Sequence, residues 1–126
     1  MFTEGFPKEL NNACLHTVSK ISNKTVNNVS CGILDEYNSD KETYYLTDGS
    51  EIRFPYRIYF EDDDNAYKEL NGLEKSIYDC IFTRHCHGRI REKHLRNLLT
   101  AGMNEWFMPY IQRLSSEYVI EMFDKS

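Results

Sequence analysis

The sequence predicts an α+β fold, in which an N-terminal helix and a small antiparallel sheet, formed by a β-hairpin over residues 43–60, pack with a C-terminal three-helix region. Three observations lead to this class. An Asp-Gly pair separates two strand-like runs, apolar residues recur at helical spacing before and after them, and 126 residues suffice to bury a core. No repeat, linker or low-complexity run divides the chain, so we expect a single domain over residues 1–126.

The first helix is predicted to begin after Phe6, because Pro7 is tolerated in a first helical turn, where its missing N–H costs nothing. Apolar residues then share one helical face, directed at the core: Leu10, Cys14, Val18 and Ile21. Cys14 is expected to be a small buried hydrophobe rather than a reactive thiol. After a polar run, residues 29–33 alternate like a half-buried strand.

The hairpin is predicted from Asp48-Gly49, which lies between two runs rich in β-branched and aromatic residues, 43–47 and 51–60. A two-residue turn needs positive φ at both central positions, and this pair tolerates it. Alternate residues of the second run should face the core: Ile52, Phe54, Tyr56, Ile58 and Phe60. Pro55 cannot donate to a ladder and therefore predicts an edge or a bulge.

The second half of the chain predicts three helices. The first should bury one stripe, with a break or kink near Asn71-Gly72: Leu70, Leu73, Ile77, Cys80 and Ile81. The next covers residues 90–100 and ends at Ala101-Gly102. The last buries a third set: Phe107, Ile111, Leu114 and Tyr118. Residues 118–123 favour a strand by composition and a helix by position, and we expect a helix.

The charged residues are unevenly distributed along the chain, whose net charge is −5. Residues 1–83 contain eight Lys and Arg against fifteen Asp and Glu, whereas residues 84–96 contain five against one. An acidic protein with one basic segment lacks the broad positive footprint that dominates nucleic-acid affinity. It suits a protein that docks onto a basic partner.

The basic segment 84–96 nevertheless permits a nucleic-acid-binding alternative. A turn at His87-Gly88 between two predicted helices has the outline of a helix-turn-helix, and the side chains of the segment are expected to lie outside. The candidate contacts to phosphates or bases are Arg84, Arg89, Arg91, Lys93 and Arg96. The same outline is common in helical corners that bind no nucleic acid.

A zinc site is a further alternative, with nitrogen and sulfur ligands from Cys86, His85, His87 and His94. The paired spacing of zinc ligands is missing, and the surrounding arginines disfavour a dication, so we expect no metal or other cofactor. The acidic run at 61–65 lacks the pattern of a calcium loop and suits a helix N-terminus. Adjacent Cys and His side chains diverge, so we also expect no enzyme built on Cys86.

The function that the sequence favours is a small, acidic, non-enzymatic protein-binding module, such as an inhibitor or a toxin-immunity-type protein that masks a basic partner. Candidate contacts come from its acidic and aromatic surface: Asp35, Glu36, Asp40, Tyr44, Tyr45, Asp62, Asp63 and Asp64. The chain shows no secretory signal and no apolar run of membrane-spanning length. Its four cysteines are therefore expected to be free thiols, in the cytoplasm.

Overall fold

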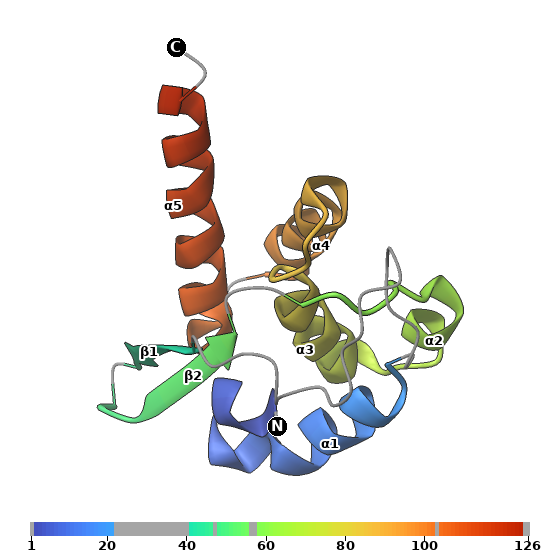
Figure 1. Cartoon of the computed structure of the whole chain (residues 1–126). Coiled ribbons are helices and arrows are strands. Elements are labelled where there is room, and N and C mark those ends of the chain that lie inside the picture. The colour runs from blue at the N-terminus through green and yellow to red at the C-terminus, as the bar shows by residue number, and fades with distance from the viewer. Residues whose placement is uncertain (1, 22–40, 47, 56–57, 103, 125–126) are drawn as a thin grey trace.

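The computed structural model describes residues 2–21, 41–46, 48–55, 58–102 and 104–124. In these residues five α-helices accompany a two-stranded antiparallel sheet, and the predicted α+β class is confirmed. The elements follow in the order η1 (Phe2–Gly5), η2 (Lys8–Leu10), α1 (Asn11–Ser19), β1 (Lys41–Tyr45), β2 (Glu51–Pro55), α2 (Asp64–Lys68), α3 (Gly72–Phe82), α4 (Gly88–Ala101), η4 (Glu105–Phe107) and α5 (Met108–Asp124). Helix α3 lies in the middle, in contact with α1 and α4 (Figure 1).

The N-terminal helix presents the face that its apolar spacing predicts. Cys14, Val18 and Ile21 are buried, and Leu10 packs against them from a half-buried position. Burial raises the pKa of the Cys14 thiol to about 12. Cys14 is therefore a core residue, as expected, and it stays protonated at neutral pH. The strand predicted at 29–33 lies outside the described residues.

The hairpin is confirmed, although its turn is longer than a two-residue turn. Strands β1 and β2 pair antiparallel, with Tyr44 opposite Ile52. The Leu46 amide donates to the Ser50 carbonyl, and the Gly49 amide donates to the Leu46 carbonyl, so three residues separate Leu46 from Ser50. Only a longer turn satisfies both bonds, and Gly49, with φ +87°, supplies its left-handed position.

The second predicted strand keeps its alternation but not its length. Ile52, Phe54, Ile58 and Phe60 are all buried, whereas the ladder with β1 ends at Pro55. Tyr56 lies outside the described residues. Beyond this point the chain makes an isolated parallel bridge to the α3–α4 connection, where the Ile58 amide donates to the Arg84 carbonyl at 2.8 Å.

The helix expected after residue 65 divides into α2 and α3, because Asn71 caps a new helix. The Asn71 side chain accepts from the Glu74 amide at 2.8 Å, and Glu74 accepts from the Asn71 amide at 3.0 Å. Ile77 belongs to the buried stripe as predicted, whereas Leu73 is 43% exposed. The prediction for Leu73 was wrong because this cap restarts the helix and places Leu73 in its outward-facing first turn.

Helix α4 ends, and helix α5 continues toward the C-terminus, as the sequence indicates. Helix α4 stops at Gly102, which has φ +100°, and α5 runs continuously to Asp124, so the expected helix at 118–123 is confirmed. Phe107 and Leu114 are buried on its predicted face. In the described part of the chain, no helix combines the length and the apolar character needed to cross a bilayer.

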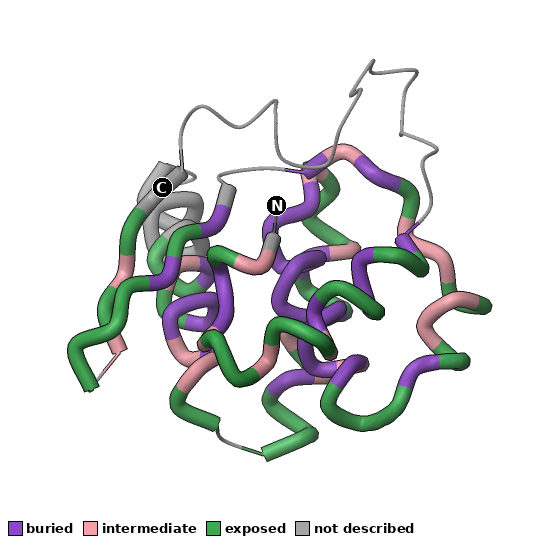
Figure 2. The backbone as a smooth tube through the Cα atoms, turned by 90° about the horizontal axis from the view of Figure 1, so that it is seen from below, coloured by how far each residue is buried: buried purple, intermediate pink, exposed green. Residues whose placement is uncertain are grey.

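An aromatic stack joins the two ends of the chain to the hairpin. The Phe54 ring stacks between Tyr44 and Tyr110, with centroids 4.7 and 4.1 Å away, and Phe6 stacks on Tyr110 at 5.4 Å. The Tyr110 hydroxyl donates to the Gly5 carbonyl at 2.8 Å, which satisfies its only polar atom inside the core. Buried residues gather where these elements face one another (Figure 2).

We predict that Gly5→Ala lowers the free energy of unfolding by about 2 kcal/mol, because the added methyl group would overlap the Tyr110 hydroxyl. Tyr110→Phe removes that hydroxyl and its hydrogen bond and should cost about 1 kcal/mol. The double variant gives the methyl group room, so its loss should be smaller than the sum of the two single losses. Urea denaturation measures all three.

Gly72→Ala is the matched control, since beyond its chain neighbours and the backbone of its own helix no described atom lies within 4 Å of the position that its Cβ would take. We expect this variant to change the free energy of unfolding by less than about 0.5 kcal/mol. Strictly additive losses in the Gly5/Tyr110 double variant would contradict a close contact between the two residues.

Candidate functional site

Two arginines of the basic segment are structural residues of the α3–α4 corner. Arg84 is 1% exposed, and its guanidinium lies over the Phe54 ring, 5.9 Å from the centroid. Arg91 is also buried, and its Nη1 donates to the carbonyls of His85 and Cys86 at 2.8 and 3.1 Å. The expectation that these arginines lie outside was wrong, because the turn between the helices needs donors for its carbonyl groups.

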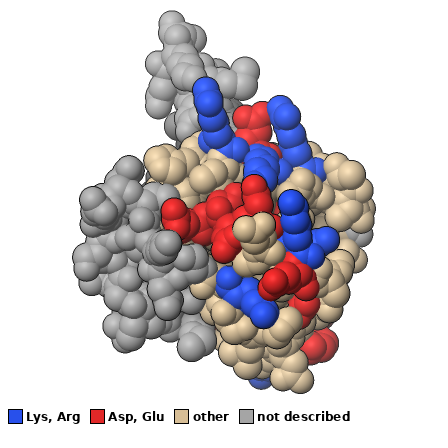
Figure 3. All heavy atoms as spheres, turned by 90° about the vertical axis from the view of Figure 1, so that its right-hand side faces the viewer, with Lys and Arg blue, Asp and Glu red and all other residues tan. Residues whose placement is uncertain are grey.

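The exposed cations of the segment lie among carboxylates. The Lys93 ammonium is 2.7 Å from an Asp64 oxygen, and the Arg96 guanidinium is 2.6 Å from Glu92. Arg89 is exposed. Basic and acidic side chains therefore interleave on this face (Figure 3), and an uninterrupted positive surface for phosphates does not form there.

His85 has both ring nitrogens engaged by the backbone. Its Nε2 donates to the Phe60 carbonyl at 2.7 Å, and its Nδ1 accepts from the His87 amide at 3.0 Å. Burial lowers the pKa of this imidazole, which agrees with a neutral ring that donates on one side and accepts on the other. A metal at His85 would have to break one of these bonds.

His94 lies at the centre of a buried polar cluster that sequence reasoning missed. Its Nδ1 is 2.6 Å from Asp79 of α3, and its Nε2 is 2.9 Å from Asp62 in the loop before α2. Tyr67 donates its hydroxyl to Asp79 and Tyr78 donates to Asp62, each at 3.0 Å. We call these five residues, from α2, α3, α4 and the loop before α2, the His94 cluster.

The charges of the His94 cluster follow from its geometry. Both nitrogens of the ring face carboxylates, and only the imidazolium can donate to two acceptors. Burial alone would lower the pKa of His94, but the hydrogen bonds to Asp62 and Asp79 outweigh it and raise the pKa. For Asp62, burial acts upward, while the hydrogen bonds from His94 and Lys93 prevail and lower the pKa to about 2.

The spacing of the buried residues in α4 is a sequence signal for the His94 cluster. Arg91, His94 and Leu98 are all buried, and their intervals of three and four residues define one inward face. Asp79 likewise lies within the apolar stripe of α3. A histidine and a carboxylate on facing apolar stripes indicate a buried pair, whereas only the fold reveals the third partner, Asp62.

The zinc ligands proposed from the sequence are not brought together. His94 is hydrogen-bonded to two carboxylates, and His85 is hydrogen-bonded to the backbone. The His87 side chain is exposed. Cys86 is partly buried, with its Sγ 3.9 Å from Nδ1 of His85. Over the described ranges, no group of three or more His, Cys, Asp and Glu side chains is arranged to hold a metal ion.

The acidic contacts proposed at the start of α2 act within the fold. Asp63 caps α2 by accepting from the amides of Asn65 and Ala66, and Asp62 and Asp64 pair with Lys93. These carboxylates are poor candidates for partner contacts, because binding would have to replace the interactions they already make. The other acidic candidates lie outside the described residues: Asp35, Glu36 and Asp40.

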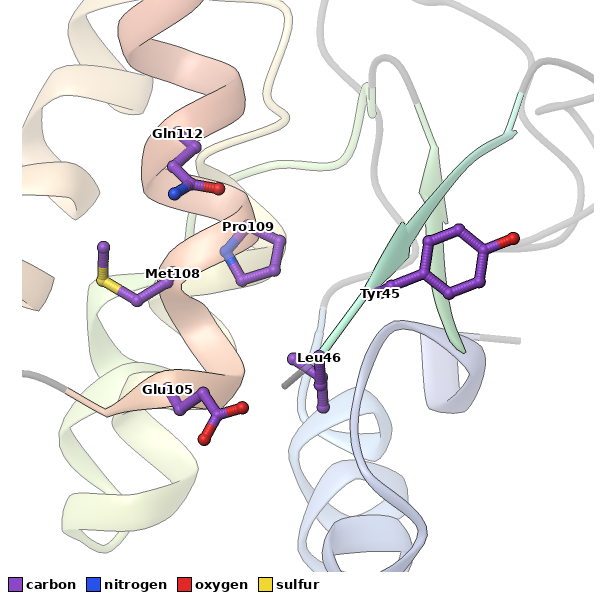
Figure 4. A pocket seen from close by; sticks show the side chains of 6 residues that line it. All are labelled: Tyr45, Leu46, Glu105, Met108, Pro109 and Gln112. Carbon is purple, nitrogen blue, oxygen red and sulfur yellow. The ribbon is translucent and has the colours of Figure 1, made fainter. Parts of the chain in front are cut away.

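The two tyrosine candidates differ in exposure, and they lie on β1, away from the carboxylates near α2. Tyr44 is half-buried against Phe54, whereas Tyr45 is 67% exposed at the end of β1. Beside Tyr45, the hairpin and the start of α5 enclose a hollow of about 260 Å³ (Figure 4). A second hollow of about 180 Å³ continues it along η4 and shares Leu46 and Glu105 with it.

Together the two hollows form what we call the hairpin groove. Its lining residues are Pro7, Glu9, Tyr45, Leu46, Asp48, Glu105, Trp106, Met108, Pro109 and Gln112. Leu46 and Pro109 lie on its opposite sides, and the Glu105 carboxylate points toward the hairpin (Figure 4). The groove thus combines an apolar and aromatic floor with acidic side chains.

The charged side chains among the described residues that line the hairpin groove are all acidic. They are Glu9, Asp48 and Glu105, and no Lys or Arg is among these described lining residues. Hydrogen bonds from the hydroxyl and amide of Ser50 lower the pKa of Asp48, which keeps this carboxylate ionised in neutral and mildly acidic solution. The groove is therefore chemically suited to a cationic, partly apolar ligand.

Comparison of the chain with protein-family models, curated proteins and solved structures found no match. The assignment of a site therefore rests on the geometry of this chain. Two features stand out on that basis: the His94 cluster, whose groups satisfy one another, and the hairpin groove, whose described lining combines acidic and apolar side chains.

We predict that the contribution of the His94–Asp62 pair to the free energy of unfolding is greatest between about pH 4 and about pH 6.5. The pKa of His94 is raised on folding, so its contribution is complete below the ordinary histidine value of 6.5 and is lost as the pH rises through the folded value. The pKa of Asp62 is lowered from 3.8 to about 2, so its contribution of about 2 kcal/mol is lost as the pH falls through that range. Urea denaturation across pH measures both limbs.

His94→Gln should remove the alkaline limb and lower the free energy of unfolding by about 3 kcal/mol, because two buried carboxylates lose their cation. His16→Gln is the matched control, since His16 pairs with Glu74 while its own side chain is 52% exposed. We expect less than about 1 kcal/mol there. Equal losses of unfolding free energy in the two variants would contradict a larger contribution from the buried His94 than from His16.

Proposed function

We propose that this protein is a non-enzymatic protein-binding module that takes a basic segment of another protein into the hairpin groove. The observation that carries the proposal is the composition of that groove, where the lining residues that the structure describes include three carboxylates and no Lys or Arg. Apolar and aromatic side chains contribute contact area there, and the carboxylates select the charge of the partner.

The aromatic residues of the groove are suited to anchoring a partner. Tyr45 is exposed, and Trp106 is half-buried with its ring against Phe6. Tyr and Trp are enriched among residues that dominate binding energy, because they bury a large area at a low cost in side-chain entropy. Because it is the chain's only Trp, Trp106 is also a natural fluorescence reporter of occupancy.

The acidic balance of the whole chain supports the same class of partner. A net charge of −5 attracts a basic protein over a distance and speeds its association. Masking of a basic surface is the mode of action of small inhibitors and of toxin-immunity-type proteins, and we propose that role by analogy of charge and size. Cys14, Cys80 and Cys86 are free thiols, which suits action in the reducing cytoplasm.

The alternatives from the sequence receive less support. A nucleic-acid interface on the basic segment loses Arg84 and Arg91 to the interior and shares its surface with Asp62, Asp64 and Glu92. A zinc site would disrupt the bonds of His85 and His94. An enzymatic role is less supported because the described residues that line the groove include no nucleophile paired with a base.

The proposal is tested by panning a phage-displayed random peptide library against the protein. We expect the recovered peptides to be rich in Lys and Arg, to bind less tightly as salt is added, and to change Trp106 fluorescence. In the triple variant Glu9→Gln/Asp48→Asn/Glu105→Gln, affinity should fall about tenfold, because three exposed charge contacts contribute about 0.5 kcal/mol each.

The control variant neutralises three exposed carboxylates outside the groove and has the same net charge, Glu61→Gln/Glu69→Gln/Glu92→Gln. It should keep most of the affinity, which separates a local groove effect from the loss of overall charge. Recovered peptides without a basic bias, or equal losses in the two triple variants, would overturn the proposed site. Tight DNA or RNA binding lost in Arg89→Ala would favour the alternative.

A further inference from the structure

One edge of the two-stranded sheet is covered by the chain itself. The 3-10 helix η1 contacts β2, and the carbonyl oxygen of Arg53 lies 3.3 Å from the Cβ position of Gly5. The Tyr110 hydroxyl holds η1 in place through the Gly5 carbonyl. The outer edge of β2 is therefore closed to another strand, as expected for an edge protected against pairing.

The other edge of the sheet, along β1, has outward-facing main-chain groups. The amide and the carbonyl of Leu46 are both used within the turn, by Ser50 and Gly49. Groups along an antiparallel strand alternate between the partner strand and the outside, so those of Tyr44 face β2, and those of Thr43 and Tyr45 face away. In the described part of the chain, β1 pairs with β2 alone.

These outward-facing positions adjoin the hairpin groove. Thr43 and Tyr45 are both exposed, and Tyr45 and Leu46 form one side of the groove opposite Pro109 and Gln112 of α5. An extended chain laid along β1 would place alternate side chains toward this groove and the others toward solvent. Main-chain bonds would supply affinity and the groove would supply selectivity.

We propose that the basic segment binds as an extended strand added to the outer edge of β1, the edge that no described strand pairs with, through hydrogen bonds to the main-chain groups of Thr43 and Tyr45. This inference rests on the proposed function, and it specifies how the partner is bound. It excludes a helical ligand, because a helix has already used its main-chain donors and acceptors internally.

Charge selects a basic segment over a second copy of this chain as the occupant. Glu51 lies opposite Tyr45 in the ladder, and Asp48 and Glu105 line the adjoining groove. Pairing β1 with β1 of a second copy would bring two such acidic sets together, which is unfavourable. A strand with Lys or Arg at alternate positions meets these carboxylates instead.

The test compares two fluorescein-labelled peptide pools of equal charge, each about eight residues long, enough to span one strand. One pool has Lys or Arg at alternate positions among β-branched residues, and the other has them at helical spacing among alanines. We expect the strand-type pool to bind. The peptide nitrogens can be methylated in two alternate sets. Methylation of the set whose N–H groups donate to the outward-facing carbonyls of β1 should weaken binding.

On the protein side, Thr43→Pro removes the outward-facing N–H without removing a ladder bond to β2, since that N–H faces away from β2. It should weaken binding of the strand-type pool by about tenfold, through a lost hydrogen bond and the obstruction by the ring. Thr43→Val is the matched control, because it keeps the N–H and the strand propensity. Thermal melting of both variants verifies the fold.

The outcomes separate the two proposals. If the helix-type pool binds better and Thr43→Pro has no effect, strand addition is wrong while the basic-partner proposal stands. If neither pool binds, both proposals fail. If the chain instead sediments as a dimer that Thr43→Pro dissociates, the occupant is a second copy, and the peptide inference is overturned.

Discussion

The buried imidazolium of His94, held between Asp62 and Asp79, is the interaction on which the helical part of this protein depends. A charge taken out of water is tolerated only where paired groups replace its hydration. Here the two carboxylates come from the loop before α2 and from α3, and the imidazolium comes from α4. The three segments can therefore satisfy their charges only when they are assembled, and this fixes the angle of the α3–α4 corner.

This constraint also explains why much of the charge of the basic segment 84–96 is used inside the fold. The basic segment supplies His94 to the cluster and Arg91 to the carbonyls of the turn, and Lys93 neutralises Asp62 and Asp64 at the rim. Charges that appear segregated along the chain are thus paired in space. A second group of acidic side chains lies at the hairpin groove, where the described lining residues include Glu9, Asp48 and Glu105 and no Lys or Arg.

The candidate site was only partly predictable. Tyr45 was singled out from the sequence because tyrosine combines an apolar ring with a polar tip, and it lines the groove. Its partners in the groove are Glu105 and Trp106, which lie about sixty residues away along the chain, and no local pattern connects them to the hairpin. The sequence did not reveal that Asp62 pairs with His94 and that Asp63 caps α2, because an acidic run before a helix has the same composition whether it caps, pairs or contacts a partner.

By itself the sequence determined what depends on local periodicity and turn chemistry: the hairpin at Asp48-Gly49, the buried face of α1, the stop of α4 at Gly102 and the helix that continues to Asp124. These follow from backbone preferences and from side chains a few residues apart. The tertiary structure alone decided which charges are buried, which edge of the sheet η1 covers and where the groove opens. Each of these depends on the pairing of distant segments, since desolvation and pairing energies are set by neighbours in space and not along the chain.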